Sequence, residues 1–243
     1  MSSTLPEWLA SHPAGRYALA REQSFYDQAV ADVFGYNAVQ YGMDGVDLLR
    51  NSRMPHRFLA GPVGGCGRLI ADVTDLPLAS QAIDLLLLPH VLEFCSLPHQ
   101  ALREAERVLR PEGHLMISVF NPHSLWGAKR WFAQEKEQGP WQGQFIALSR
   151  LKDWLSLLGF QIVAGRLGCY VPPFQDEKWL RRLSFLEKAG DRWWALGGGV
   201  YFLQAKKRVR GMRLIMPGWN DVRAVKQVLV PSAQKTGRKV MVR

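Results

Sequence analysis

The sequence predicts an α/β fold that is built around a mostly parallel sheet. Ile83–Leu88 and Leu115–Phe120 are short segments, apolar on both faces and bounded by turn residues, as buried strands of a parallel sheet are. Apolar residues recur at helical spacing between them, at Ala101, Leu102, Ala105, Val108 and Leu109. A strand–helix–strand unit of this kind takes a right-handed crossover, and ligands of such sheets bind beyond the carboxyl ends of the strands.

Five further segments predict the remaining strands. They are short, semi-apolar or alternating, and most end near a glycine: Asn37–Tyr41, His56–Ala60, Arg68–Ala71, Phe160–Arg166 and Val200–Ala205. The glycine-rich run at 61–67 leads from one expected strand into another. We therefore interpret it as a turn, because a phosphate-binding loop should lead into the first turn of a helix.

Helical spacing predicts the elements that cover the sheet. Residues 26–34 form one candidate helix, and residues 176–196 form another. Ser149 is a candidate N-cap for a helix that ends at Gly159. Residues 44–50 are expected to form a short helix, whereas residues 1–16 are expected to be irregular, since prolines and a glycine interrupt them.

Length and composition indicate one α/β domain with additions. The 243 residues are 47% hydrophobic, which is ordinary for a globular protein. The sequence contains neither an apolar run of the roughly 20 residues that a membrane span needs nor a secretory signal, so a cytoplasmic protein is expected. Cys66, Cys95 and Cys169 are widely spaced and predict reduced thiols rather than disulfides or a metal site.

The net charge of +10 is concentrated at the end of the chain. Eleven of the 31 basic residues and one of the 21 acidic residues follow residue 205, which leaves the preceding part neutral. We expect residues 1–207 to form the domain and residues 208–243 a basic C-terminal extension. Such a tail attracts nucleic acids and other anions, but a solubilising end without a specific partner is the favoured interpretation.

Three candidate positions lie where the expected strands end. Asp72 follows a strand, so its carboxylate could accept a hydrogen bond from an adenine amino group while the backbone of Val73 meets the ring; a capping aspartate is the alternative. Leu88 could pack on a cofactor base. His90 could act as a base, a hydrogen-bond partner or a structural residue. His90, Glu93 and His99 do not have the spacing of a familiar metal site, and no metal is expected.

The same block resembles the class I S-adenosylmethionine-dependent methyltransferases of the small-molecule type. The residues that carry the resemblance are Ala71–Leu78 (ADVTDLPL), Ile83–Phe94 (IDLLLLPHVLEF) and Arg107–Leu115 (RVLRPEGHL). The resemblance implies a Rossmann-like, doubly wound, mostly parallel seven-stranded sheet with its last strand antiparallel and helices on both faces. It also implies S-adenosylmethionine as the cofactor, with Gln40, Gly42, Asp72, Val73 and Leu88 as cofactor-binding positions.

The sequence departs from the family pattern in its first loop. The family has an acidic residue at the end of the first strand, followed by three alternating glycines. Here Gln40 stands at the acidic position, Gly42 matches the first glycine, and Asp44 and Val46 replace the other two. The acid that holds the ribose after the second strand is also missing. Asp44 and Asp47 are candidates to replace it.

These features predict a methyltransferase that acts on a small-molecule acceptor, with His90 orienting or deprotonating that acceptor. Residues 123–147 and 168–196 are expected to form a lid over the site. Two alternatives remain open: a catalytically inactive, methyltransferase-like protein that serves binding or regulation, and an RNA-directed methyltransferase that uses the basic tail. The oligomeric state does not follow from the sequence.

Overall fold

The computed structural model describes residues 5–62, 69–132, 139–174, 176–183, 185–187, 190 and 197–208. Contacts divide the chain into two units, residues 1–209 and residues 210–243. The first unit contains every element discussed below. The predicted extension at 208–243, apart from Arg208, lies outside the described residues, as does most of the predicted turn at 61–67 together with Cys66.

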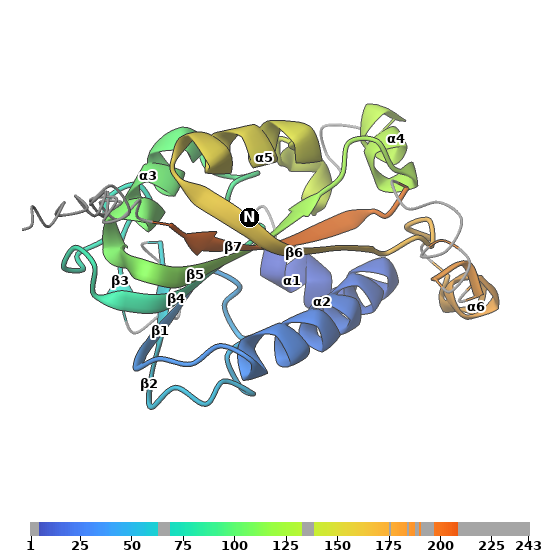
Figure 1. Cartoon of the computed structure of the whole chain (residues 1–243). Coiled ribbons are helices and arrows are strands. Elements are labelled where there is room, and N and C mark those ends of the chain that lie inside the picture. Colours follow the sequence, from blue (N-terminus) through green and yellow to red (C-terminus); the bar gives the residue numbers. More distant parts are fainter. Residues whose placement is uncertain are drawn as a thin grey trace, which may run out of the picture. The chain divides into compact units, whose positions relative to one another are not determined.

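The first unit is built on one seven-stranded sheet (Figure 1). The strands are β1 (Asn37–Tyr41), β2 (His56–Gly61), β3 (Leu69–Ile70), β4 (Ile83–Pro89), β5 (Leu109–Phe120), β6 (Phe160–Gly168) and β7 (Val200–Lys207), in the order β3-β2-β1-β4-β5-β7-β6. The pairs from β3 to β5 are parallel, and β7 runs antiparallel to both β5 and β6. The predicted fold class and the antiparallel last strand are therefore confirmed.

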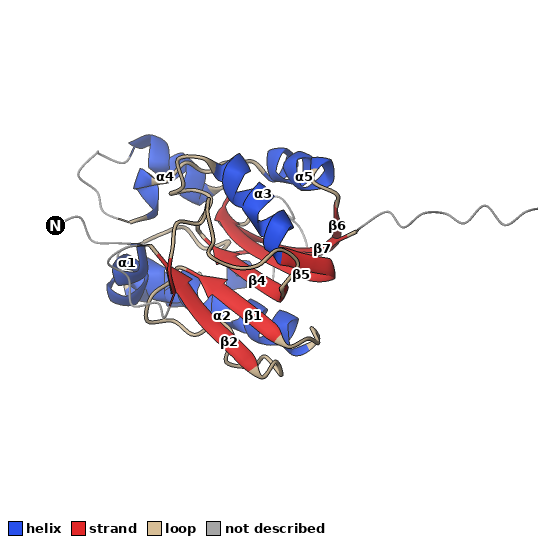
Figure 2. Ribbon diagram, turned by 90° about the vertical axis from the view of Figure 1, so that its left-hand side faces the viewer, coloured by secondary structure: helices blue, strands red, loops and turns tan. Residues whose placement is uncertain are grey.

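Helices cover both faces of this sheet (Figures 1 and 2). Helices α1 (Leu5–Ser11) and α2 (Pro13–Ala31) lie on one side, and α3 (Pro98–Val108), α4 (Leu125–Phe132) and α5 (Leu148–Leu157) lie on the other. A short 3₁₀ helix, η1 (Pro140–Gln142), and helix α6 (Glu177–Arg182) fall within the two segments predicted to form a lid. That lid role stays a prediction.

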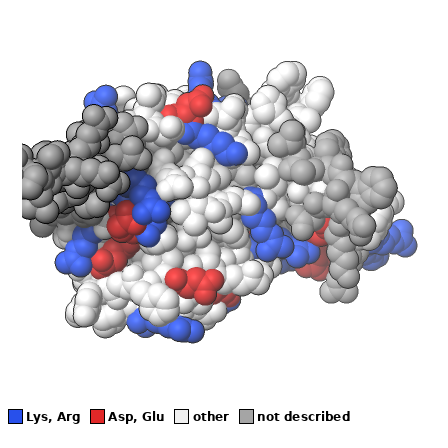
Figure 3. All heavy atoms as spheres, viewed as in Figure 1, with Lys and Arg blue, Asp and Glu red and all other residues white. Residues whose placement is uncertain are grey.

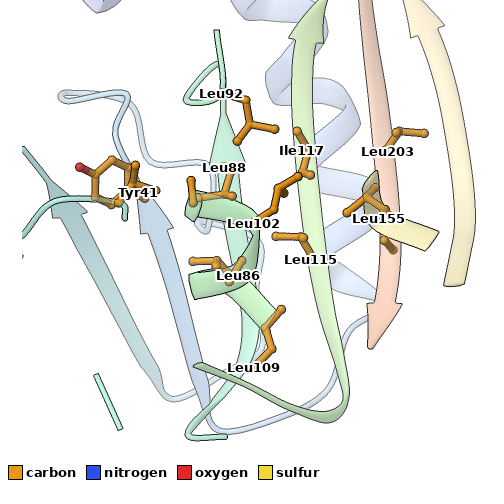
Figure 4. Close-up of a cluster of buried hydrophobic side chains, with 14 of the residues drawn as sticks. Tyr41, Leu86, Leu88, Leu92, Leu102, Leu109, Leu115, Ile117, Leu155 and Leu203 are labelled. Atoms are coloured by element: carbon orange, nitrogen blue, oxygen red, sulfur yellow. The ribbon is translucent and has the colours of Figure 1, made fainter. Parts of the chain in front are cut away.

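Strand β4 is buried on both faces, which explains its continuous apolar run. Leu85 and Leu87 pack in one core cluster with Tyr26 of α2. Leu86 and Leu88 point the opposite way into a second cluster that contains Leu102 of α3 (Figure 4). Since successive strand residues face opposite sides, one apolar strand joins both helical layers to the sheet.

The order of the strands creates a crevice between β1 and β4. From β1 the chain adds β2 and β3 on one side, and it then returns to pair β4 with the other side of β1. At such a switch point the connections leave the two neighbouring strands in opposite directions, so space opens beyond their carboxyl ends. The fold therefore places a potential ligand site next to Gly42 and His90.

The start of the chain differs from its predicted irregular structure. Residues 5–31 form α1 and α2, and Pro13 occupies the first turn of α2, where proline is tolerated because its missing N–H has no helical partner. The N-cap of α2 is His12, whose Nδ1 accepts a hydrogen bond from the Ala14 N–H at 3.2 Å. A Cβ atom on Gly15 would lie 2.5 Å from the Trp8 carbonyl oxygen, so this glycine permits close packing of the two helices.

Two local predictions were wrong. Residues 44–50 form turns instead of a helix, because the Gln40 side chain donates a hydrogen bond to the Val46 carbonyl and accepts one from the Leu48 N–H. Ala147, and not Ser149, is the N-cap residue of α5. The helix predicted at 176–196 contains α6, but much of its later part lies outside the described residues.

The surface of the first unit carries charges of both signs. In Figure 3, acidic and basic side chains lie interspersed on the visible face, among larger uncharged areas. This agrees with the balanced charge of the residues before the tail. In the described ranges, no helix has the length and apolar character needed to cross a membrane.

Candidate functional site

A cavity of about 550 Å³ opens at the crevice between β1 and β4. Its lining residues come from the last residues of β1 and β4 and from the segments that follow β1, β2, β3 and β4, with further contributions from α1 and η1. Gly42, Asp72, Val73 and His90, four of the residues predicted from the sequence, line this one cavity. The fold thus brings together positions that are up to 48 residues apart in the chain.

Gly42 and its neighbours form a left-handed turn at the edge of the cavity. The φ angles are +76° at Gly42, +58° at Met43 and +82° at Gly45. A Cβ atom on Gly42 would stand 3.7 Å from the Cγ2 atom of Val91, which follows β4. The loop after β1 and the rim of β4 therefore face each other closely, and glycine keeps the passage between them open.

Gln40 lies beneath this turn and does not line the cavity. Its Nε2 donates hydrogen bonds to the carbonyl oxygens of Gly42 at 3.1 Å and Val46 at 2.7 Å, and its Oε1 accepts one from the Leu48 N–H at 2.9 Å. A carboxylate could not donate to the two carbonyl groups. The glutamine is therefore matched to the shape of this loop, and the structure gives it a positioning role beneath the cavity.

Asp72 stands at the rim beyond β3. Its Oδ1 accepts hydrogen bonds from the backbone N–H and the hydroxyl group of Thr74, at 2.9 and 2.8 Å. These bonds to Thr74 lower the pKa of the Asp72 carboxyl group, so it is ionised at neutral pH. The neighbouring Tyr41 hydroxyl donates to the Ala71 carbonyl at 2.9 Å and fixes the chain just before Asp72.

Asp44 brings a second carboxylate to the cavity. Its Oδ1 lies 3.5 Å from the position that a Cβ atom on Gly61 would take, so the carboxylate reaches the carboxyl end of β2. Asp47 has a different place: its Oδ1 accepts a hydrogen bond from the Leu49 N–H at 2.9 Å, and it does not line this cavity. Of the two aspartates considered from the sequence, the fold places only Asp44 at the site.

His90 lies at the floor of the cavity with its side chain fully buried. Its Nε2 is 2.5 Å from Glu22 Oε1, and its Nδ1 is 2.9 Å from Glu93 Oε1. Burial alone would lower the pKa of His90, but the two carboxylates outweigh it and raise that pKa to about 10. The ring is therefore an imidazolium that donates from both nitrogens, and it has no lone pair with which to act as a base.

The Glu22–His90–Glu93 group is also tied to the surrounding sheet. Glu93 Oε1 accepts a hydrogen bond from the Phe120 N–H at 2.6 Å, and the His90 ring stacks on the Phe120 ring with 4.1 Å between centroids. His90 itself adopts a left-handed backbone conformation, with φ at +52°. This conformation is uncommon for a residue other than glycine, and the contacts on both sides of the ring hold it there.

Leu88 does not reach the cavity. It is fully buried and packs toward Leu102 and Leu92 in the core on the α3 face (Figure 4). Pro89 and Val91, which follow Leu88 in the chain, line the cavity instead. The alternation of side chains along a strand turns Leu88 away, so the structure does not support its predicted contact with a cofactor.

Several lining or supporting residues were not predicted from the sequence. Leu5 and Pro6 reach the cavity from α1, Cys95 reaches it from the loop after β4, and Gln142 reaches it from η1. Glu22 had a detectable signal, because it occupies the same helical stripe as three buried residues of α2, at four-residue spacing: Ala18, Tyr26 and Val30. A charged residue within an apolar stripe indicates a buried ionic contact. No comparable signal marks Leu5 or Gln142.

The described residues do not contain a cluster of three or more His, Cys, Asp or Glu side chains that is arranged to hold a metal ion. The contacts within the Glu22–His90–Glu93 group are ion pairs and hydrogen bonds. Cys95 and Cys169 are free thiols in the described part of the chain. Cys95 is half-buried, and Cys169 is buried.

Comparison with protein families identifies the central part of the chain. Residues 27–117 match the family model of a methyltransferase domain. The uncharacterised protein YafS of Escherichia coli K12 is 42% identical over 93 residues, which are 38% of this chain and 39% of that protein. The malonyl-[acyl-carrier protein] O-methyltransferase of Methylovorus sp. is 44% identical over 55 residues, 23% of this chain and 19% of that enzyme. The chain thus spans less than half of these relatives.

Comparison with solved structures extends the similarity of the fold to most of the first unit. A methyltransferase of Thermotoga maritima, described as a possible histamine N-methyltransferase, superposes with a TM-score of 0.58 at 17% identity. The match covers 79% of this chain and 93% of that one. At this identity the similarity establishes the fold, and the acceptor of that protein says nothing about the acceptor here.

Proposed function

We propose that this chain is a class I S-adenosylmethionine-dependent methyltransferase that binds its cofactor between β1 and β4 and methylates a small-molecule acceptor; the match of residues 27–117 to the methyltransferase-domain model supports the proposal. The cavity at the switch point carries the proposal, because Gly42 and Asp72 both line it. The cofactor supplies a methyl group on a sulfonium sulfur: an acceptor lone pair bonds to that carbon, the C–S bond breaks, a neutral thioether leaves, and any acceptor proton passes to solvent.

The cavity fits a ligand of this kind. Its volume of about 550 Å³ lies within the usual range for small-molecule sites. Asp72 offers an ionised acceptor group for an adenine amino group, and the adjacent Val73 lines the same wall. The left-handed turn at Gly42 leaves room for the amino-acid end of the cofactor beside the rim of β4.

We assign the ribose hydroxyl groups to Asp44. A carboxylate accepts two hydrogen bonds from vicinal hydroxyl groups, and Asp44 is the described acidic side chain that lines the cavity next to the end of β2. In this proposal the acid comes from the loop after β1 and reaches across to Gly61. The third family glycine is then unnecessary, since Gln40 holds the loop in a different shape.

Catalysis in this proposed site depends mainly on how the protein positions the methyl donor and the acceptor. A sulfonium needs no activation by the protein, so holding the methyl carbon in line with the acceptor supplies most of the rate. Both ring nitrogens of His90 bind carboxylates, those of Glu22 and Glu93. In the proposal, His90 positions the end of β4 and contributes to the charge at the floor of the cavity. An imidazolium with both nitrogens bound to carboxylates does not fit the predicted role of His90 as a base.

One observation favours the alternative of a binding protein without catalysis. The described ionisable side chains that line the cavity, besides His90, are Tyr41, Asp44, Asp72 and Cys95. The proposal uses Asp44 and Asp72 for cofactor binding, and the Tyr41 hydroxyl already donates a hydrogen bond to the Ala71 carbonyl. An acceptor that must lose a proton before attack would then find few bases. The RNA-directed alternative depends on a tail that lies outside the described residues.

Calorimetric titration with S-adenosylmethionine tests the proposal. The purified full chain should bind the cofactor, and Asp44→Asn should weaken binding about 10- to 100-fold, because charge-assisted hydrogen bonds contribute roughly 1.5–3 kcal/mol. Asp47→Asn is the matched control: it makes the same change in the same loop outside the cavity and should leave affinity within a few-fold. Absence of binding by the wild type at millimolar cofactor would refute the proposed function. Equal losses in both variants would refute the assignment to Asp44.

A further inference from the structure

We propose that the buried Glu22–His90–Glu93 group makes the cavity prefer a sulfonium cofactor over its neutral thioether product. The inference rests on the proposed function, and it adds a specificity role for residues that do not carry the reaction itself. It follows from the charge of the group, from its burial and from its position at the floor of the cavity.

With Glu22 and Glu93 as carboxylates and His90 as an imidazolium, the group has one net negative charge. Two carboxylates flank one imidazolium, at 2.5 Å for Glu22 and 2.9 Å for Glu93, which leaves one negative charge uncompensated. The Oε2 atoms of both glutamates are buried and have no hydrogen-bond partner within the described part of the chain. Donors from the protein therefore neutralise only the oxygens that face His90 and the Phe120 N–H.

The neighbouring titratable groups do not cancel this charge. Burial raises the pKa values of Tyr26, Tyr201 and Cys169, so all three stay neutral at physiological pH. Arg21, on α2 beside Glu22, lies 3.9 Å from Glu187 and is about half exposed. Tyr26 donates its hydroxyl proton to Ser118 and not to Glu22.

The charge acts through a medium of low polarity. The side chains of Glu22, His90 and Glu93 are all 0% exposed, so neither water nor salt screens them as it screens surface charges. His90 lines the cavity, and each carboxylate is in direct contact with its ring. A positive charge on a ligand at the rim of β4 is therefore attracted by the group.

Methyl transfer removes the very charge that this group attracts. S-adenosylmethionine has a positively charged sulfur, whereas S-adenosylhomocysteine has a neutral one, and the two ligands otherwise share their polar groups. The field of the group strengthens binding of the reactant and contributes nothing comparable to binding of the product. Residues that touch neither the acceptor nor the methyl group would thus limit inhibition by the product.

The test is the ratio of two dissociation constants, for S-adenosylhomocysteine and S-adenosylmethionine, measured by calorimetry on the full chain. In Glu22→Gln the ratio should fall by about 10-fold, the size expected for one charge roughly 10 Å away at an effective dielectric constant of about 20. Affinity for S-adenosylhomocysteine should change little. An analogue with an ammonium group in place of the sulfonium should lose affinity in Glu22→Gln to the same extent as S-adenosylmethionine.

Two further variants separate charge from structure. Glu112→Gln removes an exposed acid on β5 and should leave the ratio unchanged. Glu22→Gln combined with His90→Asn restores one net negative charge and should return the ratio toward the wild-type value, and asparagine tolerates the left-handed backbone at this position. If Glu22→Gln does not fold, Glu93→Gln makes the same change in charge from the other side of the ring.

The outcomes distinguish the two proposals. A wild-type protein that binds both ligands, with a ratio that stays constant in Glu22→Gln and Glu93→Gln, overturns the electrostatic role and leaves the proposed function standing. Equal weakening of both ligands also overturns it, since that result marks a purely structural group. A wild-type protein that binds neither ligand overturns the proposed function and this inference with it.

Discussion

Replacing Gln40 by glutamate tests whether the first loop is a damaged cofactor motif or a different one. The substitution restores the acid that the family has at this position, but it also removes the Nε2 donor that binds the carbonyl oxygens of Gly42 and Val46. Two hydrogen bonds are lost, and a buried carboxylate faces two carbonyl groups. With about 1 kcal/mol for each bond and a desolvation cost of about 1–3 kcal/mol, we expect Gln40→Glu to destabilise the fold by roughly 3–5 kcal/mol.

The assay is thermal and chemical unfolding, together with cofactor titration. The Tm of Gln40→Glu should fall by roughly 6–20 °C, and the loss should be smaller at pH 5 than at pH 8, because a protonated carboxyl group can donate one of the missing hydrogen bonds. Gln100→Glu on the exposed surface of α3 is the matched control and should leave the Tm nearly unchanged. An unchanged Tm with tighter cofactor binding would show that Gln40 is an eroded acid and that our account of the loop is wrong.

Two other predictions concern His90 and Cys95. The pKa of His90 lies near 10 in the folded protein against about 6.5 in the unfolded chain, so the folded state binds this proton more tightly. The resulting stabilisation is complete below about pH 6.5 and is lost as the pH rises toward 10. The free energy of unfolding should therefore decline over this range in the wild type and should not decline in this way in His90→Asn. Equal slopes of unfolding free energy against pH in the two proteins would contradict the assigned charge state. Cys95 lines the cavity and burial raises the pKa of its thiol, so alkylation should be slow at pH 7, faster at pH 9 and suppressed by S-adenosylmethionine. An alkylation rate of Cys95 that is the same with and without the cofactor would mean that the cofactor binds outside this cavity.

The central strands could be predicted from the sequence because their environment is uniform. Ile83–Pro89 is buried on both faces, so its apolar run identifies it without any knowledge of partners. The same uniformity explains the error at Leu88. A run that is apolar on both faces does not reveal which side chains point toward the cavity, and only the register of β4 against its helices settles this.

The helical structure within residues 1–16 was not predicted, because the prolines and the glycine there were interpreted as interruptions, whereas the predicted helix at 26–34 overlaps the end of α2. Pro13 begins a helix, and Gly15 permits contact between helices. These roles depend on neighbours in space. The Glu22–His90–Glu93 group has the same origin, since 68 residues separate Glu22 from His90 in the sequence and the contact arises only when α2 packs under β4.

The choice between Asp44 and Asp47 illustrates what the fold adds to the sequence. Both acids lie in the same loop, and their spacing gives neither an advantage. The Gln40 hydrogen bonds shape the loop so that Asp44 faces Gly61, while Asp47 binds the backbone of Leu49. Side-chain contacts inside the loop thus decide which carboxylate is available to a ligand.

A crystal structure of the full chain with S-adenosylhomocysteine tests the account most directly. We expect the ligand between β1 and β4, with its ribose hydroxyl groups within hydrogen-bond distance of the Asp44 carboxylate and its adenine amino group at Asp72. A ligand bound elsewhere, or one in this cavity whose ribose contacts neither oxygen of Asp44, would contradict the account.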